Sequence, residues 1–217
     1  MGDPKIARAV VAAVVAAHCG ADWLLRAGGV SFDPQRHVVF VGIRGYYLDS
    51  MGVRGRNDRG VYDDCLAVMC PDGLQAFRFN VDPNGSRKGR GTGAGKGMAV
   101  LKCGVWLYVM GKHKGRAGFR QGAPVTVIRD GDPPYEDTGW HAINIHDGGV
   151  RSTSSLGCQT ADPATFARFR AHAYGVLRAF SNPKAKSDWG VRDHAVPYIL
   201  IDEVGRRGLR PWEGGKV

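Results

Sequence analysis

Apolar and polar residues alternate over short runs through most of the chain, a pattern that strands of a sheet produce. The runs are rich in valine, isoleucine and aromatic residues, which favour extended backbone. Glycine, proline and aspartate separate the runs, as tight turns require. We therefore predict strands over residues 37–43, 65–70, 102–110, 123–129, 140–146 and 195–201.

The N-terminal segment, residues 3–28, lacks this alternation. Asp3 and Pro4 combine a capping residue with a proline at a first helical turn, and a run rich in alanine and valine follows. We predict helical structure through this segment, with the first helix ending near Gly20.

A second helix is predicted shortly after Cys158. Asp162 is its cap and Pro163 lies in its first turn. Apolar side chains then recur at helical spacing: Phe166, Phe169, Tyr174 and Leu177.

Many short strands with few helices indicate an α+β protein that is mainly β. The length of 217 residues suits one domain over residues 1–217. Within it we distinguish an N-terminal part, residues 1–98, and a core of about residues 99–204. The remainder, residues 205–217, is rich in arginine and glycine and is predicted to be a frayed tail.

Four polar segments are predicted to lie outside these elements. Residues 82–97 form the most loop-like stretch, and residues 112–116 are expected to be a solvated loop. Residues 57–64 suggest a hairpin with internal ion pairs, with a cleft wall as the functional alternative. Residues 89–97 resemble a phosphate-binding loop only superficially, because Gly97 stands where serine or threonine is needed.

The formal net charge is +10 and the isoelectric point about 9.6. Such a surface attracts polyanions, which include nucleic acid, anionic lipid and bacterial cell wall. No stretch approaches the roughly 20 apolar residues of a membrane span. An Ala/Val run after Lys5 and Arg8 imitates a signal peptide, but no clean cleavage site follows. We expect synthesis in the cytoplasm without a clear signal peptide.

The chain has five cysteines. No Cys-x-x-Cys pair and no zinc-finger spacing occurs among them, so we predict neither a metal nor a cofactor. Cys65 and Cys70 fall in a predicted strand and are interpreted as buried structural thiols.

Cys158 differs from these thiols because a histidine and several small residues surround it in the sequence. A cysteine nucleophile needs a base and donors for the developing oxyanion. In the predicted strand, His146 and Asn144 share one face and His141 lies on the other, so His141 ranks second as the base. A glycine pair at residues 148–149 allows the chain to turn back and bring Cys158 to this face.

The run from Ile145 to Cys158 resembles the catalytic motif of the L,D-transpeptidase catalytic domain family, a His-x-Gly segment followed by Ser-x-Gly-Cys. The resemblance implies a β-sandwich and a cysteine that forms a thioester with the stem peptide of peptidoglycan. It implies that Cys158 is the nucleophile, that His146 is the base, and that Gly157 and Ser155 form the oxyanion and positioning segment. Leu156 replaces the family's histidine.

We assign four neighbouring residues to substrate binding: Asn144, His141, Gly148 and Gln159. The chain is also similar to proteins of tailed phages, in stretches such as residues 57–64 and 153–160. We therefore expect a peptidase or transpeptidase acting on peptidoglycan stem peptides in the periplasm or at the cell wall, with phage delivery one route there. Hydrolysis and cross-linking both stay open.

Three alternatives remain. The first is a non-catalytic wall-binding or phage structural module of the same fold. The second is nucleic-acid binding, which the basic charge suggests, although aromatic residues do not interleave with the basic loop and no binding motif is present. The third is a metal site that uses His113 and His146, for which metalloprotease spacing is missing.

Overall fold

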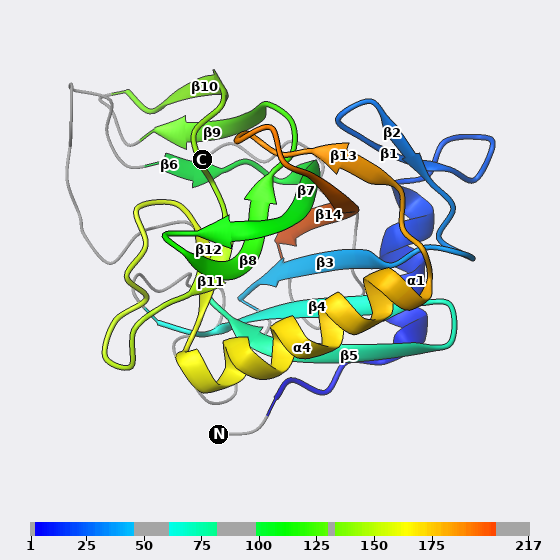
Figure 1. Cartoon of the computed structure of the whole chain (residues 1–217), viewed down its shortest axis with the longest axis horizontal. Helices are drawn as coiled ribbons and strands as arrows, with labels where there is room; N and C mark the ends of the chain where they lie inside the picture. Colours follow the sequence, from blue (N-terminus) through cyan, green and yellow to red (C-terminus); the bar gives the residue numbers. More distant parts are fainter. Residues whose placement is uncertain (1–2, 46–60, 82–98, 130–132, 203–217) are drawn as a thin grey trace.

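A sheet of nine strands runs through the part of the chain that the computed structural model describes, residues 3–45, 61–81, 99–129 and 133–202 (Figure 1). Its strand order is β12-β11-β8-β7-β14-β3-β4-β5, and β13 pairs with β14 beside this path. These strands have the following bounds: β3 Val39–Arg44, β4 Asp64–Cys70, β5 Gly73–Phe79, β7 Gly104–His113, β8 Arg116–Gln121, β11 Ile145–Asp147, β12 Gln159–Ala161, β13 Lys184–Lys186 and β14 Arg192–Asp202. The prediction of a mainly β protein of the α+β class is confirmed.

The central strands are apolar on both faces because both faces of the sheet are covered. In β3, Val39, Val41 and Ile43 pack into one hydrophobic cluster, while Phe40 packs into the cluster on the opposite face. Every residue of β3 is buried. This is why the sequence of β3 is a continuous apolar run rather than a strict alternation.

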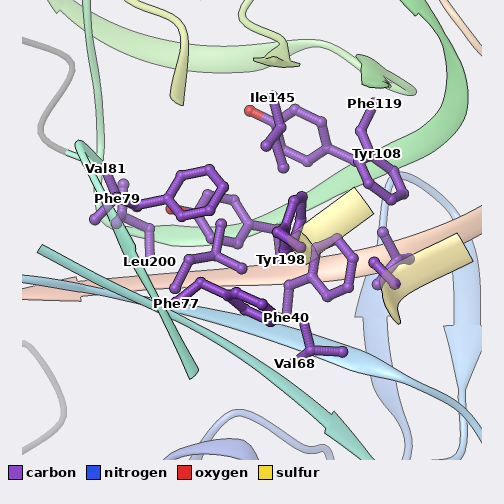
Figure 2. Close-up of a cluster of buried hydrophobic side chains, with 14 of the residues drawn as sticks. Phe40, Val68, Phe77, Phe79, Val81, Tyr108, Phe119, Ile145, Tyr198 and Leu200 are labelled. Carbon is purple, nitrogen blue, oxygen red and sulfur yellow. The ribbon is translucent and has the colours of Figure 1, made fainter. Parts of the chain in front are cut away.

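The face that carries Phe40 is covered by helix α4 (Pro163–Ala179) and by a three-stranded sheet of order β10-β9-β6 (Figure 1). The strands of this small sheet are β6 Ala99–Leu101, β9 Val125–Arg129 and β10 Tyr135–Gly139. Aromatic rings dominate the cluster beneath α4 (Figure 2). The ring of Phe169 lies edge-on to Phe40 at 5.5 Å and to Phe79 at 4.9 Å, an arrangement that aromatic pairs prefer.

The face that carries Val39, Val41 and Ile43 is covered by helix α1 (Arg8–Ala17) and by the hairpin of β1 (Leu25–Ala27) with β2 (Val30–Phe32). Val11, Val14 and Val15 of α1 pack into the cluster on this face. Neither described helix is long and apolar enough to cross a bilayer.

The helix predicted after Cys158 is confirmed as α4. The carboxylate Oδ1 of Asp162 accepts a hydrogen bond from the backbone N–H of Thr165 at 3.1 Å, as a capping residue should. Phe166, Phe169 and Leu177 are buried on one face of the helix.

The predicted helical segment over residues 3–28 is wrong in two places. The helix covers only Arg8–Ala17, and Asp3 does not cap it. Asp3 instead accepts hydrogen bonds from Arg168 at 2.9 and 2.8 Å. Residues 25–27 instead form a strand, in which Leu25 and Ala27 are buried and the residue between them is exposed, a period of two. The glycines that follow have the positive φ values that a tight hairpin needs.

The predicted strand 140–146 is mostly irregular, and only its last two residues belong to β11. Ala142 has a φ of 54°, and this left-handed conformation breaks the alternation on which the strand prediction depended. The predicted loop at 112–116 is also corrected, because β7 continues through His113 and β8 starts at Arg116.

Several predicted features lie outside the described residues. They are the loop at 82–97 with its glycine-rich run, residues 57–60 of the predicted hairpin, and the tail from residue 205. Asp64, the last residue of the predicted hairpin, is described and begins β4. Its buried carboxylate accepts hydrogen bonds from the backbone N–H groups of Gly45 at 2.6 Å and Val81 at 2.8 Å.

Candidate functional site

A cavity of about 370 Å³ opens beside β11 and β12, and Cys158 lies in its wall. Two nearby segments supply most of the lining: residues 141–143 with His146, and residues 154–158. Strand β7 and the turn after it add His113 and Lys114, and the small sheet adds Ala99 and Arg129. The cavity therefore lies between the end of the main sheet and the small sheet above it.

Parallel pairing of β11 with β12 brings the cysteine segment back beside His146. His146 is the register partner of Thr160, and Ile145 that of Gln159, so Cys158 comes just before β12. Gly148 makes the reversal between the strands possible. A Cβ atom there would lie 2.3 Å from the hydroxyl of Tyr62, which itself donates to the carbonyl oxygen of Gly149 at 2.7 Å. The predicted turn back toward His146 is confirmed.

Ser155 shapes the turn that presents the thiol. Its hydroxyl donates to the carbonyl oxygen of Cys158 at 2.6 Å and accepts from the backbone N–H of Gly157 at 3.0 Å. Gly157 has a φ of +148°, and a Cβ atom there would lie 2.8 Å from the carbonyl oxygen of Ala99. Ser155 and Gly157 thus position Cys158. The N–H of Gly157 is used within the turn, which corrects its expected place among the oxyanion donors.

The thiol of Cys158 is partly exposed and is held by backbone groups. Its Sγ atom donates to the carbonyl oxygen of Ala142 at 3.4 Å and accepts from the backbone N–H of Asn144 at 3.4 Å. Burial raises the pKa of Cys158, and the hydrogen bond from Asn144 opposes this only in part. The resting site therefore holds a neutral thiol, and neither of its hydrogen-bond partners is His146.

His146 is 8 % exposed and has a defined tautomer. Its Nδ1 atom lies 2.7 Å from the carbonyl oxygen of Asp147. A carbonyl only accepts, so Nδ1 carries the hydrogen and Nε2 of the neutral ring has a free lone pair. Burial lowers the pKa of His146, which keeps the ring neutral at physiological pH. Such a ring can take a proton, as a general base must.

A second histidine, His113, stacks on His146. The two ring centroids are 4.2 Å apart and the planes differ by 10°. The sequence paired His113 with His146 only as a possible metal site and placed His113 in a loop. The turn after it, Lys114–Gly115, has positive φ at both positions, where asparagine and glycine are the usual hairpin signal. Because a lysine stands at the first of these positions, the local sequence is typical of a basic loop rather than of a hairpin.

His141 lies in the wall of the same cavity, although the expected alternation placed it on the other face. Its Nε2 atom lies 3.1 Å from the carbonyl oxygen of Asp137, and its Nδ1 atom 3.4 Å from the guanidinium of Arg129. The carbonyl only accepts and the guanidinium only donates, so both ring nitrogens are engaged. The site therefore favours His146 over His141 as the base.

Three of the residues assigned to substrate binding do not line the cavity. Asn144 and Gln159 are fully buried. The Gln159 side chain accepts from the Tyr198 hydroxyl at 3.1 Å and donates to the carbonyl oxygen of Gly157 at 3.4 Å. Gly148 forms the reversal described above. We therefore correct their assignment: Asn144, Gln159 and Gly148 belong to the buried structure that holds the site in place. Of the four residues, only His141 lines the cavity.

Positive charge prevails at the cavity. Lys114 and Arg129 belong to its lining, and no acidic residue does among the described residues. The guanidinium of Arg129 is partly neutralised by Asp137, whose carboxylate lies 2.8 Å away. Lys114 is exposed at the rim. An anionic ligand suits this wall better than a cationic one.

The described residues contain no group of three histidine, cysteine, aspartate or glutamate side chains that could hold a metal ion. The chain matches no protein-family model, no curated protein and no solved structure. The functional assignment of the site therefore depends on its own chemistry and on the motif around Cys158.

Proposed function

We propose that this protein is a cysteine-dependent acyl-transfer enzyme that acts on the stem peptides of peptidoglycan. The observation that carries the proposal is that one cavity is lined by the Cys158 thiol and by His146, whose Nε2 atom is free to accept a proton. A nucleophile and a neutral base beside it are the parts that acyl transfer needs.

In the first half of the proposed reaction, the thiol gives up its hydrogen bond to the carbonyl oxygen of Ala142, and its S–H proton passes to Nε2 of His146. The sulfur attacks the peptide carbonyl carbon, and the carbonyl electron pair moves to oxygen. When the tetrahedral intermediate collapses, the carbon–nitrogen bond breaks and the imidazolium returns the proton to the leaving amine. The products are a thioester on Cys158 and a free amine.

In the second half, a water molecule or an acceptor amine gives a proton to Nε2 of His146 and attacks the thioester carbon. The carbon–sulfur bond breaks, and the imidazolium reprotonates the thiolate. Water yields hydrolysis and an amine yields a cross-link. The resting pair is a neutral thiol and a neutral imidazole, so proton transfer accompanies attack rather than preceding it.

The substrate class follows from two supports. The Ile145–Cys158 run resembles the L,D-transpeptidase motif, whose family acts on stem peptides. Stem peptides carry free carboxylates, and the cavity wall combines Lys114 and Arg129 with no described acid. The net charge of +10 would also hold the protein to an anionic wall.

The test is mass spectrometry of muropeptides released from purified sacculi after incubation with the protein. We expect shortened or newly cross-linked stem peptides with the wild type and none with Cys158→Ala. Cys19→Ala is the matched control, since Cys19 is also a partly exposed free thiol and should be dispensable. Products that persist in Cys158→Ala would rule out the proposed nucleophile.

A non-catalytic wall-binding module is the second candidate, and one observation favours it. The pKa of Cys158 is raised and its sulfur is not hydrogen-bonded to His146. This candidate predicts that wild type and Cys158→Ala bind sacculi equally and that neither changes the muropeptides.

A further inference from the structure

Asn144 determines which nitrogen of the His113 ring carries the hydrogen. The backbone N–H of Gln121 donates to Oδ1 of Asn144 at 3.2 Å, so the side-chain oxygen must face Gln121. The amide nitrogen of Asn144 then faces His113 and lies 3.0 Å from its Nδ1 atom. Because an amide NH₂ only donates, Nδ1 accepts, and the hydrogen of the neutral ring is on Nε2.

The two stacked histidines therefore present opposite chemistry. His146 donates through Nδ1 to the carbonyl oxygen of Asp147 and has a lone pair on Nε2. His113 accepts at Nδ1 and has an N–H at Nε2, for which the described residues provide no hydrogen-bond partner. Both rings line the cavity of Cys158. The pair therefore offers the cavity one proton acceptor and one neutral N–H donor, the two functions that acyl transfer needs beside its nucleophile.

The backbone around the thiol offers few donors for a developing oxyanion. The N–H of Gly157 donates to the Ser155 hydroxyl at 3.0 Å, and the N–H of Gln159 donates to the carbonyl oxygen of Asn144 at 2.8 Å. Of these three consecutive residues, only Cys158 keeps an N–H without a partner in the described structure. Acyl transfer gains most from several donors aimed at the same oxygen, so a second one has to come from another element.

We propose that His113 is a further catalytic residue, whose Nε2–H donates a hydrogen bond to the oxyanion while His146 acts as the base. This inference rests on the proposed function. His113 keeps its proton throughout: the hydrogen bond strengthens as negative charge develops on the carbonyl oxygen and weakens when the tetrahedral intermediate collapses. The N–H of Cys158 is its partner donor.

The protonation state of His113 agrees with this role. Burial, together with the nearby His146, lowers the pKa of His113 to about 4. The ring therefore stays neutral over the physiological range and acts as a neutral N–H donor.

The experiment compares two reactions of the same thiol. Acylation of Cys158 by p-nitrophenyl acetate passes through an oxyanion, whereas alkylation by iodoacetamide does not. His113→Phe keeps a flat ring against His146 but removes the N–H, and His113→Gln retains an N–H donor. We expect His113→Phe to slow acylation by about 100- to 1000-fold, the usual cost of a lost oxyanion donor, with alkylation changed by less than about twofold. His113→Gln should recover part of the acylation rate.

The acylation rate, the alkylation rate and the sacculus assay together separate this inference from the proposed function. If His113→Phe acylates like the wild type, or loses both reactions equally, the donor role is overturned and His113 only supports His146. If the wild type acylates no faster than Cys158→Ala, the proposed function fails and this inference with it. If acylation depends on His113 but sacculi are not altered, the inference stands and the proposed substrate class fails.

Nitrogen-15 NMR of the imidazoles gives a second readout that does not depend on activity. We expect the hydrogen on Nε2 in His113 and on Nδ1 in His146. The opposite tautomer in His113 would overturn the proposal even if the variants are slow.

Discussion

The centre of the sheet and its cavity end are built on different principles. At the centre, β3 and residues 195–201 of β14 contribute side chains that are almost all apolar and buried, and Phe169 of α4 packs on the same cluster. At the cavity end, the buried side chains include Asn144, His146 and many other polar ones: Thr153, Ser155, Gln159 and Thr160. Buried polar groups contribute little net stability even when they are hydrogen-bonded.

The difference separates the part of the molecule that provides stability from the part that positions the reactive side chains. Apolar burial at the centre tolerates many arrangements of similar volume. At the cavity end, Asn144 and Ser155 make directional hydrogen bonds to Cys158, through the backbone N–H of Asn144 and the hydroxyl of Ser155. Substitutions at the centre should therefore change stability alone, and substitutions at the cavity end should change chemistry more than stability.

The largest expected effect is chemical. Cys158→Ser should lower the rate of muropeptide conversion by at least about a thousandfold, because a hydroxyl is a far weaker nucleophile at neutral pH. Its free energy of unfolding should stay within about 1 kcal/mol of the wild type, since the site is partly exposed. Turnover assays on sacculi and urea denaturation measure the two quantities. Strong destabilisation would show that Cys158 belongs to the core rather than to the site.

Phe169→Ala tests the other half of the comparison. The ring is fully buried and packs on five other phenylalanines, so its loss should lower the free energy of unfolding by about 3–5 kcal/mol. The activity of the molecules that remain folded should be unchanged. Trp23→Ala, at a side chain that is 71 % exposed, is the control and should stay within about 0.5 kcal/mol.

Asn144→Ala should affect both quantities, because it removes a buried group that also orients His113. The N–H of Gln121 and Nδ1 of His113 lose their partner, which should cost about 1–3 kcal/mol of unfolding free energy. The rate of muropeptide conversion should fall as well. A loss of stability with full activity would separate Asn144 from the site.

The stability of the protein should fall as pH decreases from about 6.5 to about 4. The pKa of His113 is about 4 in the folded protein and near its ordinary value in the unfolded chain, so the unfolded chain binds the extra proton in this window. His146 contributes in the same direction because its pKa is also lowered. Denaturation at a series of pH values should give a shallower dependence for His113→Phe, by up to about one proton.

The smallest effect concerns the rim of the cavity. Lys114→Glu should raise KM for an anionic stem peptide about two- to fivefold, the range expected for an exposed charge, with little change in kcat. Lys184→Glu is the control, an exposed lysine in β13 away from the cavity. Equal effects of the two variants would indicate that net charge, and not the rim, attracts the substrate.

Sequence reasoning succeeded where a local pattern settles the structure. The α4 helix followed from Asp162, Pro163 and the spacing of its phenylalanines, and β3 followed from its β-branched run. It failed at residues 25–27, where a helical interpretation competed with a two-residue period, and at Ala142, whose left-handed backbone nothing in the local sequence requires.

The candidate site was predictable only in part for a similar reason. The motif around Cys158 identified the thiol, its turn and His146, all of which belong to one continuous segment. His113 comes from a different strand and reaches the site through β7–β8 pairing and the buried Asn144. Such a contact depends on the arrangement of the whole sheet, which a local pattern does not contain.

The central claim is that Cys158 forms a covalent acyl-enzyme with a stem peptide. Its most direct test is to mix the protein with a purified disaccharide-peptide, quench in acid and map the modified peptide by tandem mass spectrometry. The account predicts an added mass equal to the acyl part of the stem peptide, on the peptide that carries Cys158 and absent from Cys158→Ser. Conversion of the substrate without any adduct on Cys158, at the same rate in Cys158→Ser, would contradict it.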